Sequence, residues 1–173
     1  LAADRSPAGH DRQHARPRAR RQAVARAAAI VYLAGMSWTD PRAEIEALTL
    51  RLQEIRRDIH RHPELAWSET RSRDQIAARL QALGLQPRAV AGTGLILDLP
   101  GEGPRVALRA DTDALPIQEE TGLPFASEVP GVMHACGHDG HSAMLLGAAM
   151  ALVRSPIAAP VRLLWQPAEE KGE

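Results

Sequence analysis

Two stretches early in the chain show apolar residues at every third or fourth position, which indicates amphipathic helices. The first begins after Asp40, a residue suited to cap a helix, and ends near His62, because Pro63 disfavours helical geometry in the residue before it. The second spans about 68–83 and stops at Gly84. The apolar positions of the first helix are Ile45, Leu48, Leu52, Ile55 and Ile59.

Short apolar runs then replace the helical pattern and predict strands. Residues 114–131 contain three prolines and two glycines, so we expect an irregular excursion there. Residues 141–153 are mostly apolar and predict a buried helix, with Asp139 as its N-cap. The predicted strands are 87–91, 94–99, 105–109 and 161–165.

The third and fourth of these strands are joined by a long crossover that contains the buried helix. This order predicts a parallel pair within an α/β sheet. Functional groups gather beyond the carboxyl ends of such strands. Those positions hold Asp111 and Asp113 after the third strand, and Glu169 and Glu170 after the fourth. We therefore expect these carboxylates and the start of the helix to lie at one edge of the sheet.

Composition narrows the classes of partner. Hydrophobic residues make up 45% of the 173 residues, which suits a globular protein with a real core. The net charge is zero, but residues 1–35 carry seven Arg against two Asp, which leaves 14 basic and 19 acidic residues elsewhere. This mildly acidic body argues against a nucleic-acid partner. No apolar run reaches the roughly 18 residues of a membrane-spanning helix, so we expect no membrane partner.

The single cysteine excludes an intrachain disulfide and fits a reducing compartment, so we expect a cytoplasmic protein. Residues 1–35 are rich in Arg and Ala, and we expect most of them to be disordered. Three interpretations stay open for this segment: it is not native to the folded protein, it is a targeting peptide, or it is a basic binding arm. We expect residues 36–173 to form the folded part.

The stretch MHACGHDGH, residues 133–141, holds three histidines and the only cysteine. Cys136 and His138 flank a glycine that lets both side chains turn toward one point. Thiolate, imidazole and carboxylate together suit a transition metal, zinc above all. A Cys/His nucleophile pair is a second interpretation, but it gives the carboxylates no role. A solvated loop whose histidines cap the helix is a third.

The acidic pairs also have two interpretations each. Asp111 and Asp113 form either a turn that caps the next segment or a ligand with its orienting neighbour. Glu169 and Glu170 form either an exposed acidic turn or a metal ligand beside a general base.

Four further segments stand out in order along the chain: RRDIHRHPELAWSE (56–69), RADTDALP (109–116), GVMHACGHDGHSAMLLGAA (131–149) and VRLLWQPAEE (161–170). Together they resemble the M20 metallopeptidase family, nearest to its aminoacylase, hippurate hydrolase and indoleacetyl-amino-acid hydrolase branch. The resemblance covers about Ile45 to Glu170. It implies an α/β fold: the N-terminal part of a zinc-peptidase-like catalytic domain, with a mostly parallel mixed sheet flanked by helices.

The resemblance also implies roles for individual residues. Cys136, His138 and Glu170 are similar to the family's metal ligands, Glu169 to its general base, and Asp113 to the acidic residue that orients the site. His134 and His141 would have supporting or helix-start roles. The implied reaction is metal-dependent hydrolysis of the amide bond in an N-acyl amino acid or a related conjugate. The implied cofactor is a divalent metal, zinc or manganese, with cobalt and nickel also suited, and two ions per complete site.

The sequence departs from the family after Glu170, where further ligands, a lid or dimerisation domain and later strands would follow. We therefore expect a truncated piece that is inactive and metal-poor by itself, whereas the full-length form is expected to be a homo-oligomer. The alternative is a genuine short protein that acts as a non-catalytic binding or regulatory module.

Overall fold

The computed structural model describes residues 42–154 and 156–172, apart from the side chains of residues 43–45. The expectations for residues 1–35 concern a segment outside this range and stay predictions. The elements in chain order are α2 (Arg42–Arg61), α3 (Thr70–Gln81), β1 (Arg88–Val90), β2 (Gly94–Leu99), β3 (Val106–Asp111), α4 (His138–Arg154), β4 (Val161–Gln166) and the short 3₁₀ helix η1 (Glu169–Lys171). Each helix and strand predicted from the sequence is present, with ends displaced by up to three residues.

The four strands form one mixed sheet in the order β1-β2-β4-β3, which confirms the predicted α/β fold class. β3 and β4 pair in parallel, with Leu108 opposite Leu163, so the predicted parallel pair is confirmed. β2 pairs antiparallel with both β1 and β4, so parallel pairing does not predominate in this part of the sheet. The reason is connectivity: among the described strands, only β3 and β4 are joined through a helical crossover.

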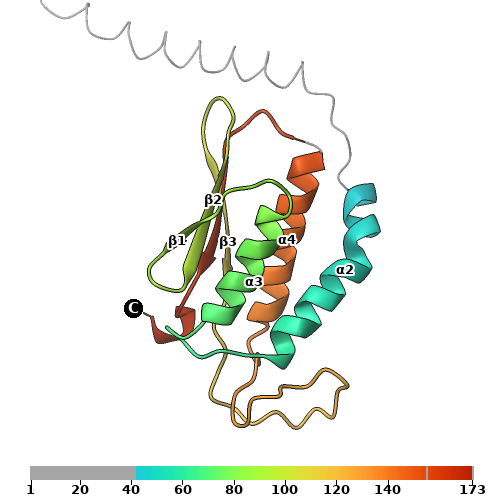
Figure 1. The fold of residues 1–173 in the computed structure, drawn as a ribbon, viewed down its shortest axis with the longest axis vertical. Helices are drawn as coiled ribbons and strands as arrows, with labels where there is room; N and C mark the ends of the chain where they lie inside the picture. Colours follow the sequence, from blue (N-terminus) through green and yellow to red (C-terminus); the bar gives the residue numbers. More distant parts are fainter. Residues whose placement is uncertain (1–41, 155, 173) are drawn as a thin grey trace, which may run out of the picture. The chain divides into compact units, whose positions relative to one another are not determined.

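Helices α3 and α4 pack against the sheet, and α2 packs against α4 (Figure 1). The burial of β4 alternates, so Val161, Leu163 and Trp165 face the core while the residues between them are half-buried. Gly147 permits the close approach of α2 to α4, because a Cβ at this position would lie 2.8 Å from a methyl carbon of Leu52. The core is therefore built from one face of the sheet and the helices that cover it.

The start of α4 differs from the prediction. The helix begins at His138, and Asp139 lies in its first turn instead of at the N-cap. The carboxylate of Asp139 is fully buried and accepts hydrogen bonds from His60 and Arg56 of α2. The N-cap prediction for Asp139 was wrong. Its side chain forms hydrogen bonds with another helix, α2, and does not cap its own helix.

At the start of α3, the cap is supplied by a residue other than the one at the N-cap position. Glu69 occupies the N-cap position, but its side chain makes no capping hydrogen bond. Glu64 takes over this function, because its two carboxylate oxygens accept the backbone N–H groups of Arg71 and Ser72 at 2.8 and 2.7 Å. The side chain of Glu69 is thereby left for another contact.

The segment between β3 and α4 is irregular, as predicted, and lies at one end of the sheet (Figure 1). It is fixed by two isolated bridges, Leu65 with Ala114 and Leu115 with Met133. Inside it, the Glu119 carboxylate accepts hydrogen bonds from Thr121 and from the backbone N–H of Ser127. The excursion is therefore tied both to itself and to the segment that precedes α3.

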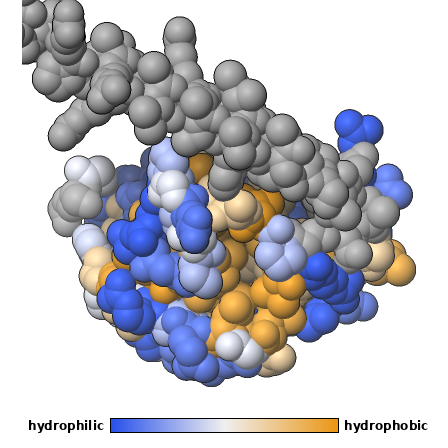
Figure 2. Space-filling model, turned by 90° about the horizontal axis from the view of Figure 1, so that it is seen from above, coloured by the Kyte–Doolittle hydropathy of each residue, from blue (hydrophilic) through white to orange (hydrophobic). Residues whose placement is uncertain are grey.

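The surface is mixed in polarity. Figure 2 shows apolar residues exposed beside hydrophilic ones on the face seen from above. Across the described residues, the most exposed large apolar side chains are Leu50 and Met144, at 76% and 64%. None of the described helices has both the length and the apolar character needed to cross a membrane.

Candidate metal centre

The candidate site is built at the carboxyl ends of the parallel strands β3 and β4. Asp111 is the last residue of β3, and Glu169 and Glu170 begin η1 shortly after β4. His138 is the first residue of α4. The side chains that were predicted to meet from strand ends and a helix start therefore lie at one edge of the sheet.

Cys136, His138 and Glu170 converge so closely that one potential ligand atom from each lies within 4.8 Å of the others. His138 is buried, whereas Cys136 and Glu170 are exposed. The Nε2 atom of His138 lies 3.8 Å from Oε1 of Glu170. These are the three residues whose positions match the metal ligands implied by the resemblance.

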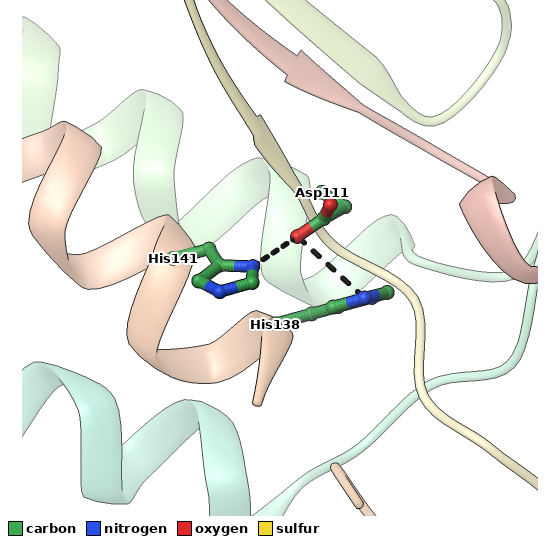
Figure 3. A group of neighbouring side chains, drawn as sticks. All are labelled: Asp111, His138 and His141. Carbon is green, nitrogen blue, oxygen red and sulfur yellow. Dashed lines mark hydrogen bonds and ion pairs between the residues drawn. The ribbon is translucent and has the colours of Figure 1, made fainter. Parts of the chain in front are cut away.

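A second convergent group shares His138 and adds Asp111 and His141 (Figure 3). Oδ1 of Asp111 lies 2.6 Å from Nδ1 of His141 and 3.6 Å from Nε2 of His138. The sequence interpretation gave His141 only a supporting role. It offered Asp111 as one of a ligand and its orienting neighbour, but the family resemblance assigned this residue no role. The spacing of three residues between the histidines was the available signal, because it places both on one face of a helix.

Asp113 is buried, at 1% exposure, and contacts His138, which both groups share, and Glu170. Its Oδ2 atom accepts the backbone N–H of Glu170 at 3.0 Å. Its backbone carbonyl lies 2.9 Å from Nδ1 of His138. An Nδ1–H that donates to this carbonyl leaves Nε2 of His138 unprotonated and directed toward the other carboxylates. Asp113 thus contacts the two chain segments that carry His138 and Glu170.

Glu169 lies at the open side of the cluster and is only partly exposed. Its Oε2 atom is 3.9 Å from Nε2 of His138, and its Oε1 atom is 3.8 Å from Arg109. A carboxylate at this place can reach a water molecule held near His138. A shallow cavity of about 410 Å³ adjoins the site and is lined in part by Asp111, His141 and Met144.

The electrostatic environment favours a cation. The hydrogen bond between Cys136 and Glu170, followed by burial and the charges of Glu170, Asp111 and Glu169, raises the pKa of the Cys136 thiol above its usual value. Burial works against ionisation of Asp111, but the hydrogen bond to His141 and the charge of His138 outweigh it and lower the pKa of this carboxyl. A bound cation would neutralise the carboxylates and hold Cys136 as a thiolate.

Thiolate, imidazole and carboxylate donors within this distance fit a divalent transition metal. The buried Oδ1 atom of Asp113 has no hydrogen-bond partner and lies 3.3 Å from Nδ1 of His138, the ring nitrogen that Asp113 orients. The residues present therefore suit a metal better than they suit a solvated loop.

A buried polar network behind the site was not found from the sequence. His60 links two carboxylates, with Nδ1 2.9 Å from Asp139 and Nε2 3.3 Å from Glu119. His134 is 3% exposed, and neither of its ring nitrogens has a hydrogen-bond partner. Burial, with smaller effects from neighbouring charges, lowers the pKa of His134 to about 4. The local signal was that His60, His134 and Asp139 fall within the RRDIHRH and MHACGHDGH motifs, whereas Glu119 lies outside both.

Comparisons with known proteins show which family this chain resembles. Residues 107–173 match the family described as Peptidase family M20/M25/M40. Over 133 residues the chain is 49% identical to N-acetyl-L-cysteine deacetylase of Bacillus subtilis, a match that covers 74% of this chain and 32% of the relative. A Rhodococcus jostii protein named as glutamate–cysteine ligase 2-3 is 51% identical over 139 residues, which are only 17% of its length.

The fold is similar to that of a crystal structure described as a dinuclear metal-binding peptidase of the M20 family from Bacillus subtilis. The TM-score is 0.69 at 46% identity, over 72% of this chain and 37% of that one. The resemblance of this chain to the M20 family is therefore confirmed in sequence and in fold. The chain spans about a third or less of the length of these curated relatives.

Proposed function

We propose that this chain forms part of a metal-dependent amidohydrolase that cleaves the amide bond of N-acyl amino acids or related conjugates. The observation that carries the proposal is the convergence of Cys136, His138 and Glu170 at one strand edge. The N-acyl amino acid in the name of the Bacillus subtilis deacetylase supports the substrate class. Zinc or manganese is the proposed metal, and the dinuclear description of the structural relative supports two ions per complete site.

In this mechanism the residues of the chain have separate tasks. Cys136, His138 and Glu170 would hold the metal, which would supply Lewis acidity toward the scissile carbonyl when bound. Glu169 accepts the proton of the attacking water and delivers it to the leaving amine. Asp113 fixes His138 through its carbonyl and Glu170 through its carboxylate. Orientation by such contacts keeps the ligands in place before the metal binds.

The proposal also covers the size of the substrate, the location and the oligomeric state of the full-length form. A small-molecule substrate, a cytoplasmic location and a homo-oligomeric full-length form are consistent with a metal-dependent amidohydrolase. The free thiol of Cys136 requires reducing conditions, because oxidation would remove it as a ligand.

Titration of the purified chain with Co²⁺ tests the ligand set. We expect a metal-poor preparation that binds Co²⁺ when the ion is in excess, with a thiolate-to-cobalt charge-transfer absorption that Cys136→Ser abolishes. His138→Ala and Glu170→Gln should weaken binding. His62→Ala is the control, because His62 is paired with Asp58 and Glu128 away from the candidate ligands. Absence of the charge-transfer band in the parent chain would refute the proposed site.

Hydrolysis is best measured in a chimera in which this chain replaces the matching segment of the Bacillus subtilis deacetylase. We expect release of amino acid from N-acetyl substrates, and a large loss of kcat in Glu169→Gln with smaller change in metal content. The chain by itself is expected to be inactive. Robust hydrolysis by the isolated chain, lost in Glu169→Gln, would contradict that expectation.

A further inference from the structure

Glu69 is a buried carboxylate that reaches across the fold to the segment carrying the glutamate pair. Its side chain is fully buried. Oε1 accepts the backbone N–H of Ala168 at 2.8 Å, although the two residues are 99 positions apart in the sequence. Oε2 accepts the hydroxyl of Thr93 at 2.6 Å. Glu69 therefore joins the start of α3, the start of β2 and the turn before η1.

The turn that Glu69 contacts is constrained. Ala168 has a φ of 53°, a left-handed conformation that costs a non-glycine residue free energy and persists only when its surroundings hold it. Pro167 is wedged against Gly94, where a Cβ would lie 2.8 Å from its ring. Asp113 holds the N–H of Glu170 from the other side. Two buried carboxylates thus fix the backbone on either side of Glu169.

Capping of α3 does not account for Glu69. Glu64 already accepts the backbone N–H groups of Arg71 and Ser72 in the first turn of that helix, and the side chain of Glu69 makes no capping hydrogen bond. Within the described residues, Glu69 makes hydrogen bonds but no ion pair to a basic side chain. A buried carboxylate without a cationic partner is costly. Its contact with Ala168 gives a reason for a polar side chain at this buried position.

We propose that Glu69 is a positioning residue that sets the orientation of Glu169 and Glu170 through the backbone N–H of Ala168. The inference rests on the proposed metal site, because Glu69 would act by orienting Glu170 toward the metal and Glu169 toward the attacking water. Thr93 acts in support, because its hydroxyl holds the second oxygen of Glu69 and so fixes the plane of the carboxylate.

The test compares Co²⁺ affinity and the absorption spectrum of the bound ion in four variants of the chain. Glu69→Ala should weaken Co²⁺ binding about tenfold, the lower end of the effect usual for residues that orient ligands. It should also change the visible bands that report the carboxylate ligand. Glu69→Gln should restore both, because its amide oxygen can accept from Ala168 while its amide nitrogen donates to Thr93. Thr93→Val should give an intermediate loss of affinity.

Glu64→Ala is the matched control. It removes a carboxylate of the same segment and lowers the stability of α3, but it touches neither Ala168 nor the glutamate pair. Its Co²⁺ affinity and spectrum should equal those of the parent chain, at a temperature where circular dichroism shows every variant folded. Equal effects of Glu64→Ala and Glu69→Ala would mean that Glu69 is merely structural.

The outcomes separate this inference from the proposed function. If the parent chain fails to bind Co²⁺ through Cys136, the proposed site and the role of Glu69 are both refuted. If Cys136→Ser and Glu170→Gln weaken binding but Glu69→Ala and Thr93→Val do not, only the role of Glu69 is refuted. Should Glu69→Ala not fold, a parent-like affinity and spectrum in Thr93→Val would overturn the inference.

Discussion

Replacement of His134 by Leu should remove a large part of the pH dependence of stability. His134 is buried, neither ring nitrogen has a hydrogen-bond partner, and its pKa is lowered from 6.5 to about 4. As the pH falls, the unfolded chain binds a proton at this imidazole near pH 6.5, whereas the folded protein resists until about pH 4. The stabilisation from the neutral ring is therefore complete above pH 6.5 and is lost progressively between pH 6.5 and 4.

The size of this effect follows from the two pKa values. A difference of about 2.5 in pKa corresponds to at most about 3 kcal/mol, at about 1.4 kcal/mol for each pKa unit. Such a loss is a substantial fraction of the roughly 5–15 kcal/mol that stabilises an ordinary domain. The His134→Leu variant keeps every other histidine and carboxylate of the chain, so the difference between the two proteins isolates the contribution of His134.

The assay is urea unfolding followed by far-ultraviolet circular dichroism, in EDTA, at a series of pH values from 7.5 to 4. We expect the free energy of unfolding of the parent chain to fall by about 3 kcal/mol more than that of His134→Leu across this window, with equal m values. A difference between the two proteins that stays constant with pH would refute the reasoning. An NMR titration of the His134 ring with a midpoint near 6.5 would do the same.

Three further predictions concern packing and surface charge. Gly101→Ala should destabilise the protein by at least about 1–3 kcal/mol in thermal unfolding, because its Cβ would lie 2.4 Å from backbone atoms of Ala159 and Pro160, which cannot rotate away; a melting temperature like that of the parent would contradict this close backbone contact. Leu146→Ala should cost about 2–5 kcal/mol in urea unfolding, because Leu146 is 0% exposed in the centre of the core; a loss below 1 kcal/mol would show that the site is looser than described. Arg162→Ala should leave the melting temperature close to that of the parent, although its guanidinium forms two 2.8 Å hydrogen bonds with Asp98, because water and salt screen this surface ion pair; a large fall in melting temperature that persists at high salt would show that the pair is not screened by water.

The sequence determined the elements and the edge at which the chemistry gathers. The run GLILDL gives β2 with the predicted bounds, 94–99. The strand, helix and strand that run from β3 to β4 predicted a parallel pair, and the parallel pair in turn brought the strand-end carboxylates close to Cys136 and His138. These inferences succeeded because periodicity, breakers and strand direction are local properties with a fixed geometric consequence.

Only the tertiary structure decided which side chain each polar group meets. Asp139 suited an N-cap by its place in the sequence, yet it pairs with His60, which is 79 positions away. Glu69 lies at the N-cap position of α3, yet its side chain accepts the backbone N–H of Ala168 and does not cap the helix. Both choices depend on how α2 and the segment before α3 fold back onto the sheet. The physical reason is that a buried carboxylate must find its donors among whatever groups packing brings near, and residue spacing along the chain carries no record of that packing.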